Sequence, residues 1–282
     1  MRAAITVLIL LVTLTCGAAP AQVETAPAVV TGFIENGDVR LSYELNLPKG
    51  RAPFPAVVIG HGSGKATKET CRFMSVRMLE RGYATLCYDK RGVGQSTGQF
   101  VFVGTTDSPW VFPELASDMA AGVRHLRGLG DIDRSRIGLI GVSQAGWIIP
   151  LAAELSSPAF MILLVGPTVS VGEEMFYSKF AEGTALALDE AYAKLPEFKG
   201  PYGFDPRPVL DKLTVPGLWL LGGQDRSIPT PRTTKILDDL IASGRPYEYH
   251  VYPNNGHDLG GAPYWIDVDR WLTRVSARRW IP

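Results

Sequence analysis

The sequence predicts an α/β fold in which a mostly parallel sheet is covered by helices on both faces. Short, almost continuously apolar runs recur along the chain, segments with helical periodicity separate them, and polar turns follow the apolar runs directly. Strands of a parallel sheet read as uninterrupted apolar runs because helices bury both of their faces. Active sites in such sheets lie beyond the carboxyl ends of the strands.

The domain opens with a β-hairpin at one edge of this sheet. Residues 29–33 and 39–47 alternate apolar and polar side chains around Asn36-Gly37, and Asn-Gly between two such runs is a strong hairpin signal. Further strands are expected at residues 56–60, 84–88, 137–140, 160–165, 217–221 and 247–252. Helices are expected at residues 71–81, 114–129, 232–243 and 263–276.

One segment, about residues 167–208, interrupts this alternation. It has no buried strand pattern, but it has a helix-like stretch at residues 183–195 and many aromatic side chains. Structureless loops of this length are uncommon in compact domains, so we expect a short helical lid inserted above the site. Its aromatic residues either pack the lid against the body or line an apolar pocket. They are Phe176, Tyr177, Phe180, Tyr202 and Phe204.

Composition indicates one globular domain, which we place at residues 22–282. The chain has 282 residues, of which 46% are hydrophobic and 20% charged, enough for one large α/β domain. Lys and Arg together number 28, as do Asp and Glu, so no bulk charge attracts nucleic acid or an anionic membrane. The expected partner is a small molecule bound at a site, and the oligomeric state is left open.

The first 21 residues have the pattern of a secretory signal peptide. Arg2 precedes the apolar run 5–14, and small residues lead to Ala19-Pro20-Ala21. The apolar run is too short for a permanent anchor, so cleavage after Ala21 leaves a secreted or periplasmic protein without a stable membrane anchor. The alternative is a lipoprotein acylated at Cys16, to which the preceding Thr15 is a poor fit.

Two cysteines, Cys71 and Cys87, remain after removal of the leader. In an exported protein they permit one disulfide, and the alternative is two buried thiols. The sequence leaves these two open, because a bridge depends on a Cα separation that it does not reveal. No cysteine spacing suggests a metal site, and no metal or organic cofactor is expected.

Residues 136–147 carry the pattern around which the other motifs are interpreted. The apolar run 137–140 ends in Gly141, Ser143 follows, and small residues lead into a second apolar run. This predicts a strand, a sharp turn and a helix, with the Ser143 hydroxyl at the tip of the turn. The pattern resembles the nucleophile elbow of the α/β-hydrolase fold, G-x-S-x-G, except that Ala145 replaces the second glycine and Gly146 comes one position later.

The resemblance implies an α/β-hydrolase fold with an oxyanion hole beside Ser143. His61-Gly62-Ser63-Gly64 follows the first buried strand, where an H-G motif in α/β-hydrolases forms half of the hole. It implies that the backbone N–H groups of Ser63 and Gln144 are the two donors. The alternative is a glycine-rich turn that only reverses the chain.

Residues 89–96 resemble a second motif of many α/β-hydrolases, D-x-R-G-x-G-x-S. The resemblance implies structural roles for Asp89 and Arg91, whose charges brace the loop that carries the oxyanion turn. A phosphate-binding role for residues 92–94 is disfavoured, because no helix with a Lys-Ser/Thr start follows and Pro109 and Pro113 intervene.

Two further residues complete the set that the resemblance implies. Asp225 follows the strand at 217–221 and His257 follows the last strand, so Ser143, Asp225 and His257 occur in the chain order of an α/β-hydrolase triad. The other histidines lie elsewhere: His125 in a helix, His250 inside a strand and His61 in the oxyanion turn. His257 is therefore the expected general base and Asp225 its acid partner.

These residues predict a serine hydrolase that cleaves carboxylic esters of small or medium acyl groups through an acyl-enzyme. An acyl thioesterase and an iminopeptidase-like peptidase are alternatives, and in the peptidase Glu173 or Glu174 of the lid would bind a substrate amino group. A different class is a non-catalytic binding protein on the same fold. Such proteins usually lack a triad member, and none is missing here.

Overall fold

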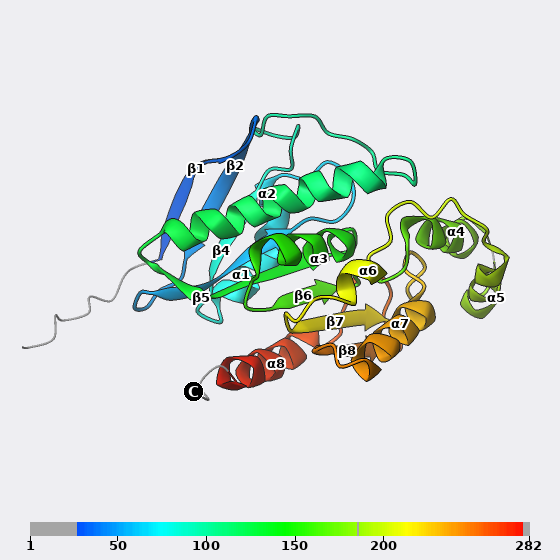
Figure 1. Cartoon of the computed structure of the whole chain (residues 1–282). Helices are drawn as coiled ribbons and strands as arrows, with labels where there is room; N and C mark the ends of the chain where they lie inside the picture. Colours follow the sequence, from blue (N-terminus) through cyan, green and yellow to red (C-terminus); the bar gives the residue numbers. More distant parts are fainter. Residues whose placement is uncertain (1–26, 185, 279–282) are drawn as a thin grey trace, which may run out of the picture.

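The structure is a computed structural model that describes residues 27–184 and 186–278. The predicted signal peptide and Cys16 lie outside these residues. The described chain forms a central sheet between two layers of helices (Figure 1). Among its helices, none is long and apolar enough to cross a membrane.

The described sheet has eight strands in the order β1-β2-β4-β3-β5-β6-β7-β8. Within this sheet, β1 pairs antiparallel with β2, and β2 pairs antiparallel with β4. The remaining neighbouring strands pair in parallel. The strands are β1 (Ala28–Asn36), β2 (Val39–Leu47), β3 (Phe54–Gly60), β4 (Ala84–Tyr88), β5 (Ile132–Val142), β6 (Met161–Leu164), β7 (Gly217–Gly222) and β8 (Tyr247–Tyr252).

Alternate residues of each strand feed two separate hydrophobic cores. On β3, for example, Ala56 and Val58 pack into one core while Val57 and Ile59 pack into the other. The helices of the first core are α2 (Ser108–Gly128), α3 (Ala145–Ser156), α6 (Arg207–Leu210) and α7 (Thr230–Ala242). Those of the second are α1 (Arg72–Leu79), which follows a 3-10 turn at Lys68–Cys71, and α8 (Tyr264–Arg278). The predicted parallel sheet with helices on both faces is confirmed.

The hairpin turns at Gly37-Asp38, one position later than predicted, because Asn36 is still paired with Val39 at the end of β1. Gly37 has φ +62°, which a glycine at the first position of a two-residue turn adopts. The helix expected from residue 114 begins earlier, at Ser108. Pro109 stands in its first turn, where the missing N–H has no intrahelical acceptor to lose.

The described residues between β6 and β7 form three short helices and a 3-10 turn. The helix expected at 183–195 is shorter, α5 (Leu188–Ala193), followed by the turn Leu195–Glu197, and α4 (Val171–Ala181) precedes it. Ser170 starts α4 with a capping box, because its hydroxyl accepts from the N–H of Glu173 while the Glu173 carboxylate accepts from the N–H of Ser170. This Ser-x-x-Glu signal was visible in the sequence. Both α4 and α5 lie at the carboxyl end of the sheet (Figure 1).

A buried carboxylate joins the hairpin, the loop after β4 and helix α2. Asp118 is fully buried and accepts two hydrogen bonds from the Arg91 guanidinium, at 2.7 and 2.9 Å, and one from Asn36 at 2.8 Å. Arg91 also pairs with Glu114 at 2.7 Å. Asp89 in the same loop accepts from the N–H groups of Lys68 and Gln95. Both Asp89 and Arg91 are thus engaged in structural contacts, as expected.

Replacing Asp118 with Ala should destabilise the fold by about 3 kcal/mol, because the substitution leaves the guanidinium of Arg91 buried without its main partner. Denaturant unfolding measures the change. Asp269→Ala is the matched control: it breaks the exposed pair with Arg81 and should cost less than about 1 kcal/mol. Equal losses in the two variants would show that Asp118 does not hold these segments together.

Candidate active site

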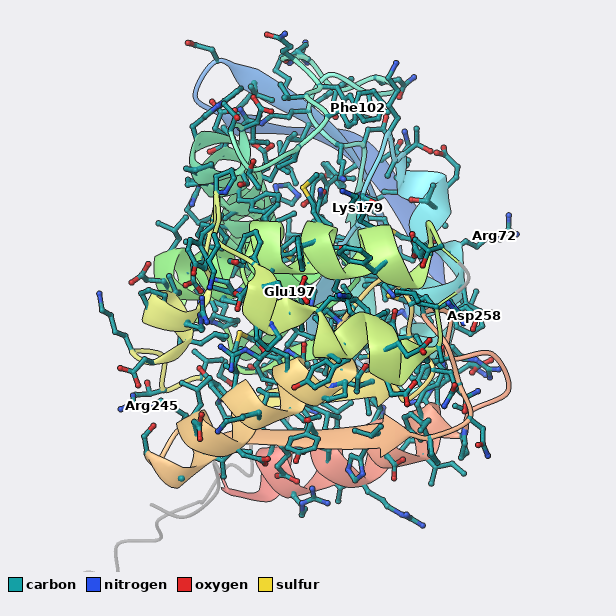
Figure 2. The ribbon with its side chains drawn as sticks, turned by 90° about the vertical axis from the view of Figure 1, so that its right-hand side faces the viewer. Arg72, Phe102, Lys179, Glu197, Arg245 and Asp258 are labelled. Atoms are coloured by element: carbon teal, nitrogen blue, oxygen red, sulfur yellow. The ribbon has the colours of Figure 1, made fainter. Side chains whose placement is uncertain are left out.

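The residues singled out from the sequence meet at the carboxyl ends of the parallel strands. Ser63 follows β3, Ser143 follows β5, Asp225 follows β7 and His257 follows β8. Figure 2 looks onto this end of the molecule: α4 lies across its middle, the loop bearing Phe102 lies above, and α7 and α8 lie below.

Ser143 stands in a left-handed turn between β5 and α3. Its φ is +55°, and its N–H donates to the carbonyl of Leu164 at 2.9 Å. A side chain is impossible at Gly141, where a Cβ would lie 2.5 Å from the Cβ of Ala145. The methyl group of Ala145 is tolerated because Gly141 leaves that space empty.

Gly146, the glycine displaced by one position, has a packing role of its own. A Cβ at this position would lie 2.5 Å from Cδ of Pro167 and 2.7 Å from Cα of Gly166. The start of α3 therefore passes directly against the chain that leaves β6. The second glycine stands at position 146, and not at 145 as in G-x-S-x-G, because position 146 is the one that lies against the backbone of Gly166 and Pro167.

Ser143, His257 and Asp225 form one chain of hydrogen bonds. The Nε2 of His257 lies 3.0 Å from the Oγ of Ser143, and its Nδ1 lies 2.8 Å from Oδ2 of Asp225. Asp225 is buried, and its Oδ1 accepts from the N–H groups of Ser227 and Ile228, both at 2.8 Å. Because the carboxylate only accepts, Nδ1 carries the proton and Nε2 is free to accept from the serine hydroxyl.

Two glycines allow His257 to reach Asp225. A Cβ at Gly222 would lie 2.3 Å from the carbonyl oxygen of Gly256, and a Cβ at Gly223 would lie 2.7 Å from Cα of Pro253. The turns after β7 and β8 therefore pack backbone against backbone. The sequence showed Gly222-Gly223 ahead of Asp225, but not which segment they face.

The proposed oxyanion donors lie beside Ser143. Within the described residues, the N–H groups of Ser63 and Gln144 donate to no carbonyl or side chain. His61 anchors their turn, because it is buried and its Nε2 donates to the carbonyl of Tyr88 at 2.6 Å. The two N–H groups are available to a ligand.

Two cavities are lined by the sequence neighbours of Ser143, one by Gln144 and the other by Val142. One, of about 120 Å³, is lined by Ser63, Gln144, the 99–103 loop, the charged residues Lys90, Arg91 and Glu114, and apolar residues of α2. The other, of about 210 Å³, lies beside His257 and is lined mainly by apolar side chains such as Phe73, Met74 and Leu164. The sequence did not single out the 99–103 loop, which contributes Phe100, Val101, Phe102 and Val103 to the first cavity.

Comparison with known proteins identifies the family. Residues 36–191, more than half of the chain, match the family described as X-Pro dipeptidyl-peptidase (S15 family). The chain belongs to the S15 family.

The S15 chain also resembles named hydrolases. A protein of Methylorubrum extorquens named as a carboxymethylenebutenolidase is 26% identical over 218 residues, 75% of this chain and 65% of that protein. Esterase EstD of Thermotoga maritima is 25% identical over 233 residues, 72% of this chain and 53% of that protein. The chain thus spans less than two thirds of the length of either relative.

An esterase of Pyrococcus furiosus has a similar fold. Its structure gives a TM-score of 0.67 at 17% identity and covers 88% of this chain and 90% of that one. The chain therefore has the α/β-hydrolase fold, and the predicted fold class is confirmed.

The structure of the S15 chain also bears on metal binding and on the state of Cys71 and Cys87. Over residues 27–184 and 186–278, no three His, Cys, Asp or Glu side chains are grouped so as to hold a metal ion. Cys71 and Cys87 are buried free thiols, so the structure shows the second of the two alternatives left open by the sequence. The Sγ of Cys71 lies 3.7 Å from Nδ1 of His61, beneath the oxyanion turn.

Hydrogen bonds join the segment predicted as a lid to the turn that carries Asp225. Tyr177 of α4 donates its hydroxyl to the backbone carbonyl of Asp225 at 2.8 Å. Arg226 donates to the carbonyl of Ala181, the last residue of α4, and to that of Leu186 beyond the helix. The other aromatic side chains of the lid mainly contact one another. The ring of Phe176 contacts the rings of Phe180 and Phe198, and the ring of Phe198 also contacts that of Tyr202. Phe204 instead packs edge-on against Phe112 of α2.

The two lid glutamates differ in their surroundings. Glu173 is buried in the capping box of α4 and pairs with Arg207 at 3.1 Å and Arg232 at 3.7 Å. Glu174 is half-buried near Asp225 and His257. Burial, reinforced by the nearby carboxylates of Glu182 and Asp225, raises the pKa of Glu174 to about 8, although His257 opposes the shift.

Competing effects set the proton affinity of His257. Burial alone would lower its pKa, but the hydrogen bond and the charge of Asp225 outweigh burial, and Glu174 and Glu182 act in the same direction. The pKa of His257 is therefore raised above the ordinary histidine value. Its protonated form is stabilised by this set of carboxylates.

Asp225→Asn should lower the pKa of His257, because the substitution removes the charge that opposes burial while the burial itself remains. NMR titration of the histidine rings measures the shift, with the exposed His250 as an internal reference. An unchanged or higher pKa of His257 would show that Asp225 does not stabilise the imidazolium.

Proposed function

We propose that this chain hydrolyses carboxylic esters of small or medium acyl groups with Ser143 as nucleophile, His257 as general base and Asp225 as its partner. The hydrogen-bonded chain from Asp225 through His257 to Ser143 is the observation that carries the proposal. The mainly apolar lining of the larger cavity supports an ester over a highly charged substrate. The resemblance to named esterases supports the same reaction class.

In the first half of the reaction, the Oγ of Ser143 attacks the ester carbonyl while Nε2 of His257 takes the hydroxyl proton. Asp225 holds the imidazole in the required tautomer and stabilises the imidazolium without taking the proton. The carbonyl oxygen becomes an oxyanion that accepts from the N–H groups of Ser63 and Gln144. Such a donor contributes about 10²–10³ in rate in measured cases.

The intermediate then breaks its bond to the leaving alkoxy oxygen, which takes the proton from His257 and departs as an alcohol. The acyl group remains on Ser143 as an ester. His257 next takes a proton from water, whose oxygen attacks the acyl carbonyl. Collapse of this second intermediate returns the proton to Ser143 and releases the carboxylic acid.

The positions of the two cavities suggest which part of the ester each holds. The carbonyl must lie between Ser63 and Gln144, which line the smaller cavity, so this cavity receives the acyl chain. Its volume of about 120 Å³ is smaller than the 210 Å³ of the other cavity, which fits a short chain. His257 protonates the leaving oxygen and borders the larger cavity, so that cavity receives the alcohol.

A second candidate is hydrolysis of an aminoacyl amide, and Glu174 is the observation that favours it. Its half-buried carboxylate has no ion-pair partner among the described residues and faces further carboxylates. A substrate ammonium group would relieve the repulsion among these carboxylates. The S15 family is named for a peptidase, which agrees with this candidate.

We also propose that the protein is exported, on the leader pattern of residues 1–21. Its substrate is then a small molecule met in the periplasm or outside the cell.

Ser143→Ala should abolish ester hydrolysis and leave the fold intact, because the substitution removes one hydroxyl at an elbow and none of the core. Hydrolysis of nitrophenyl esters and labelling by a fluorophosphonate probe measure the loss, and circular dichroism controls for folding. A purified variant that hydrolyses esters at a rate comparable to that of the parent protein would refute the assignment.

Glu174→Gln separates the two candidate substrates. If the substrate is an ester, activity on neutral nitrophenyl esters should persist with the acid limb of the pH profile unchanged, because the raised pKa of Glu174 keeps its carboxyl protonated over that limb. If it is an aminoacyl amide, the parent should cleave aminoacyl nitroanilides in preference and the variant should lose that activity selectively. Glu173→Gln is the control for a change in lid stability.

Val103→Trp should shorten the range of acyl chains accepted, because the indole fills the smaller cavity. We expect at least about a tenfold larger loss for butyryl than for acetyl nitrophenyl esters, the scale at which pockets discriminate methylenes. Phe73→Ala, which opens the larger cavity, is the matched control and should alter the preference among alcohols instead. A uniform loss over all acyl lengths in Val103→Trp would place the acyl chain elsewhere.

A further inference from the structure

The geometry points to Lys90 as a positioning residue that holds both halves of the oxyanion hole in place. This inference rests on the proposed function of Ser143. Lys90 lies between Asp89 and Arg91 in the loop after β4, but its side chain turns toward the site while theirs turn into structural contacts. With Ser63 and Gln144 it lines the smaller cavity.

The ammonium group of Lys90 has three protons and three acceptors. It donates to the carbonyls of Gly62 at 2.6 Å and Gly64 at 3.1 Å and to Oε1 of Gln144 at 2.9 Å. Lys90 is only 4% exposed and Gln144 only 7% exposed. One cation thus links the turn that carries one N–H donor to the residue that carries the other.

The contact with Gly62 acts directly on the donor of Ser63. The carbonyl of Gly62 and the N–H of Ser63 belong to one planar peptide unit and point in opposite directions. Fixing the carbonyl therefore fixes the direction of the N–H, which matters in a glycine turn whose peptide planes rotate easily. The positive charge on the carbonyl also polarises the unit and makes the N–H a stronger donor.

The charge of Lys90 is unbalanced in the resting protein. Among the described residues, no carboxylate lies within ion-pair distance of its ammonium. Burial lowers the pKa of Lys90 to about 8, so the cation is held at a cost in desolvation. The oxyanion formed during ester hydrolysis supplies the missing negative charge one peptide unit away, so the contact is stronger in the transition state than in the resting site.

Lys90→Met tests the assignment in the full chain. We expect kcat to fall about 10- to 100-fold, less than the 10²–10³ lost when a donor is removed outright, with little change in KM. A trifluoromethyl ketone forms an adduct on Ser143 that carries an oxyanion, so its inhibition constant should rise by the same factor as kcat falls. A purely structural lysine would lower the melting temperature and leave this inhibition constant unchanged.

Lys68→Met is the matched control, because Lys68 is also largely buried and pairs with Asp89, outside the turn. It should lower stability while kcat stays within about twofold, as expected for a residue with no shared partner. Gln144→Met is the second variant: it retains the backbone N–H but removes the Oε1 acceptor, and it tests the link if Lys90→Met does not fold. In a double-mutant cycle the two losses should be less than additive.

The outcomes separate this inference from the proposed function. If the parent protein is labelled by a fluorophosphonate and cleaves esters, but Lys90→Met and Gln144→Met retain the parent kcat and inhibition constant, the role of Lys90 is refuted alone. If the parent protein neither reacts with the probe nor cleaves esters, the proposed function fails, and the role of Lys90 fails with it.

Discussion

Close approach of backbones at the carboxyl edge of the sheet is the constraint on which the whole site depends. Gly141 leaves room for the first turn of α3, and Gly146 leaves room for the chain that follows β6. Gly222 leaves room for the turn that carries His257. Each glycine removes a Cβ that would push two segments apart. Without these contacts Ser143 and His257 would lie on strands of the same sheet but outside hydrogen-bond reach.

Charge is distributed unequally on the two sides of Ser143. The carboxylates of Asp225 and Glu182 act together on His257, which in the proposed reaction takes up a proton first. Lys90 lies on the other side, behind the N–H groups that would receive the oxyanion. The protein thus places negative charge where positive charge develops and positive charge where negative charge develops. In a partly buried site such fixed charges need no reorganisation during the reaction.

The features that sequence predicted are those determined by local chemistry. Apolar runs gave the strands, Asn36-Gly37 gave the hairpin, and the small residues around Ser143 gave the elbow. Asp225 and His257 followed from their place after strands, and the structure brings both to Ser143. The sequence did not reveal the roles of residues whose contacts come from distant segments of the chain. Lys90 looks like its charged neighbours until its acceptors are known, and Glu174 differs from Glu173 only in what each faces.

The hydroxyl of Tyr177 joins the lid to the carbonyl of Asp225, the residue that orients His257. The insertion between β6 and β7 is therefore not an interchangeable module. Replacing this insertion with the lid of another member of the superfamily would also remove the hydrogen bond from Tyr177 that holds the turn bearing Asp225. Chimeras made to alter substrate range need a hydroxyl donor at this point, because otherwise a change in selectivity is mixed with the effect of a displaced Asp225.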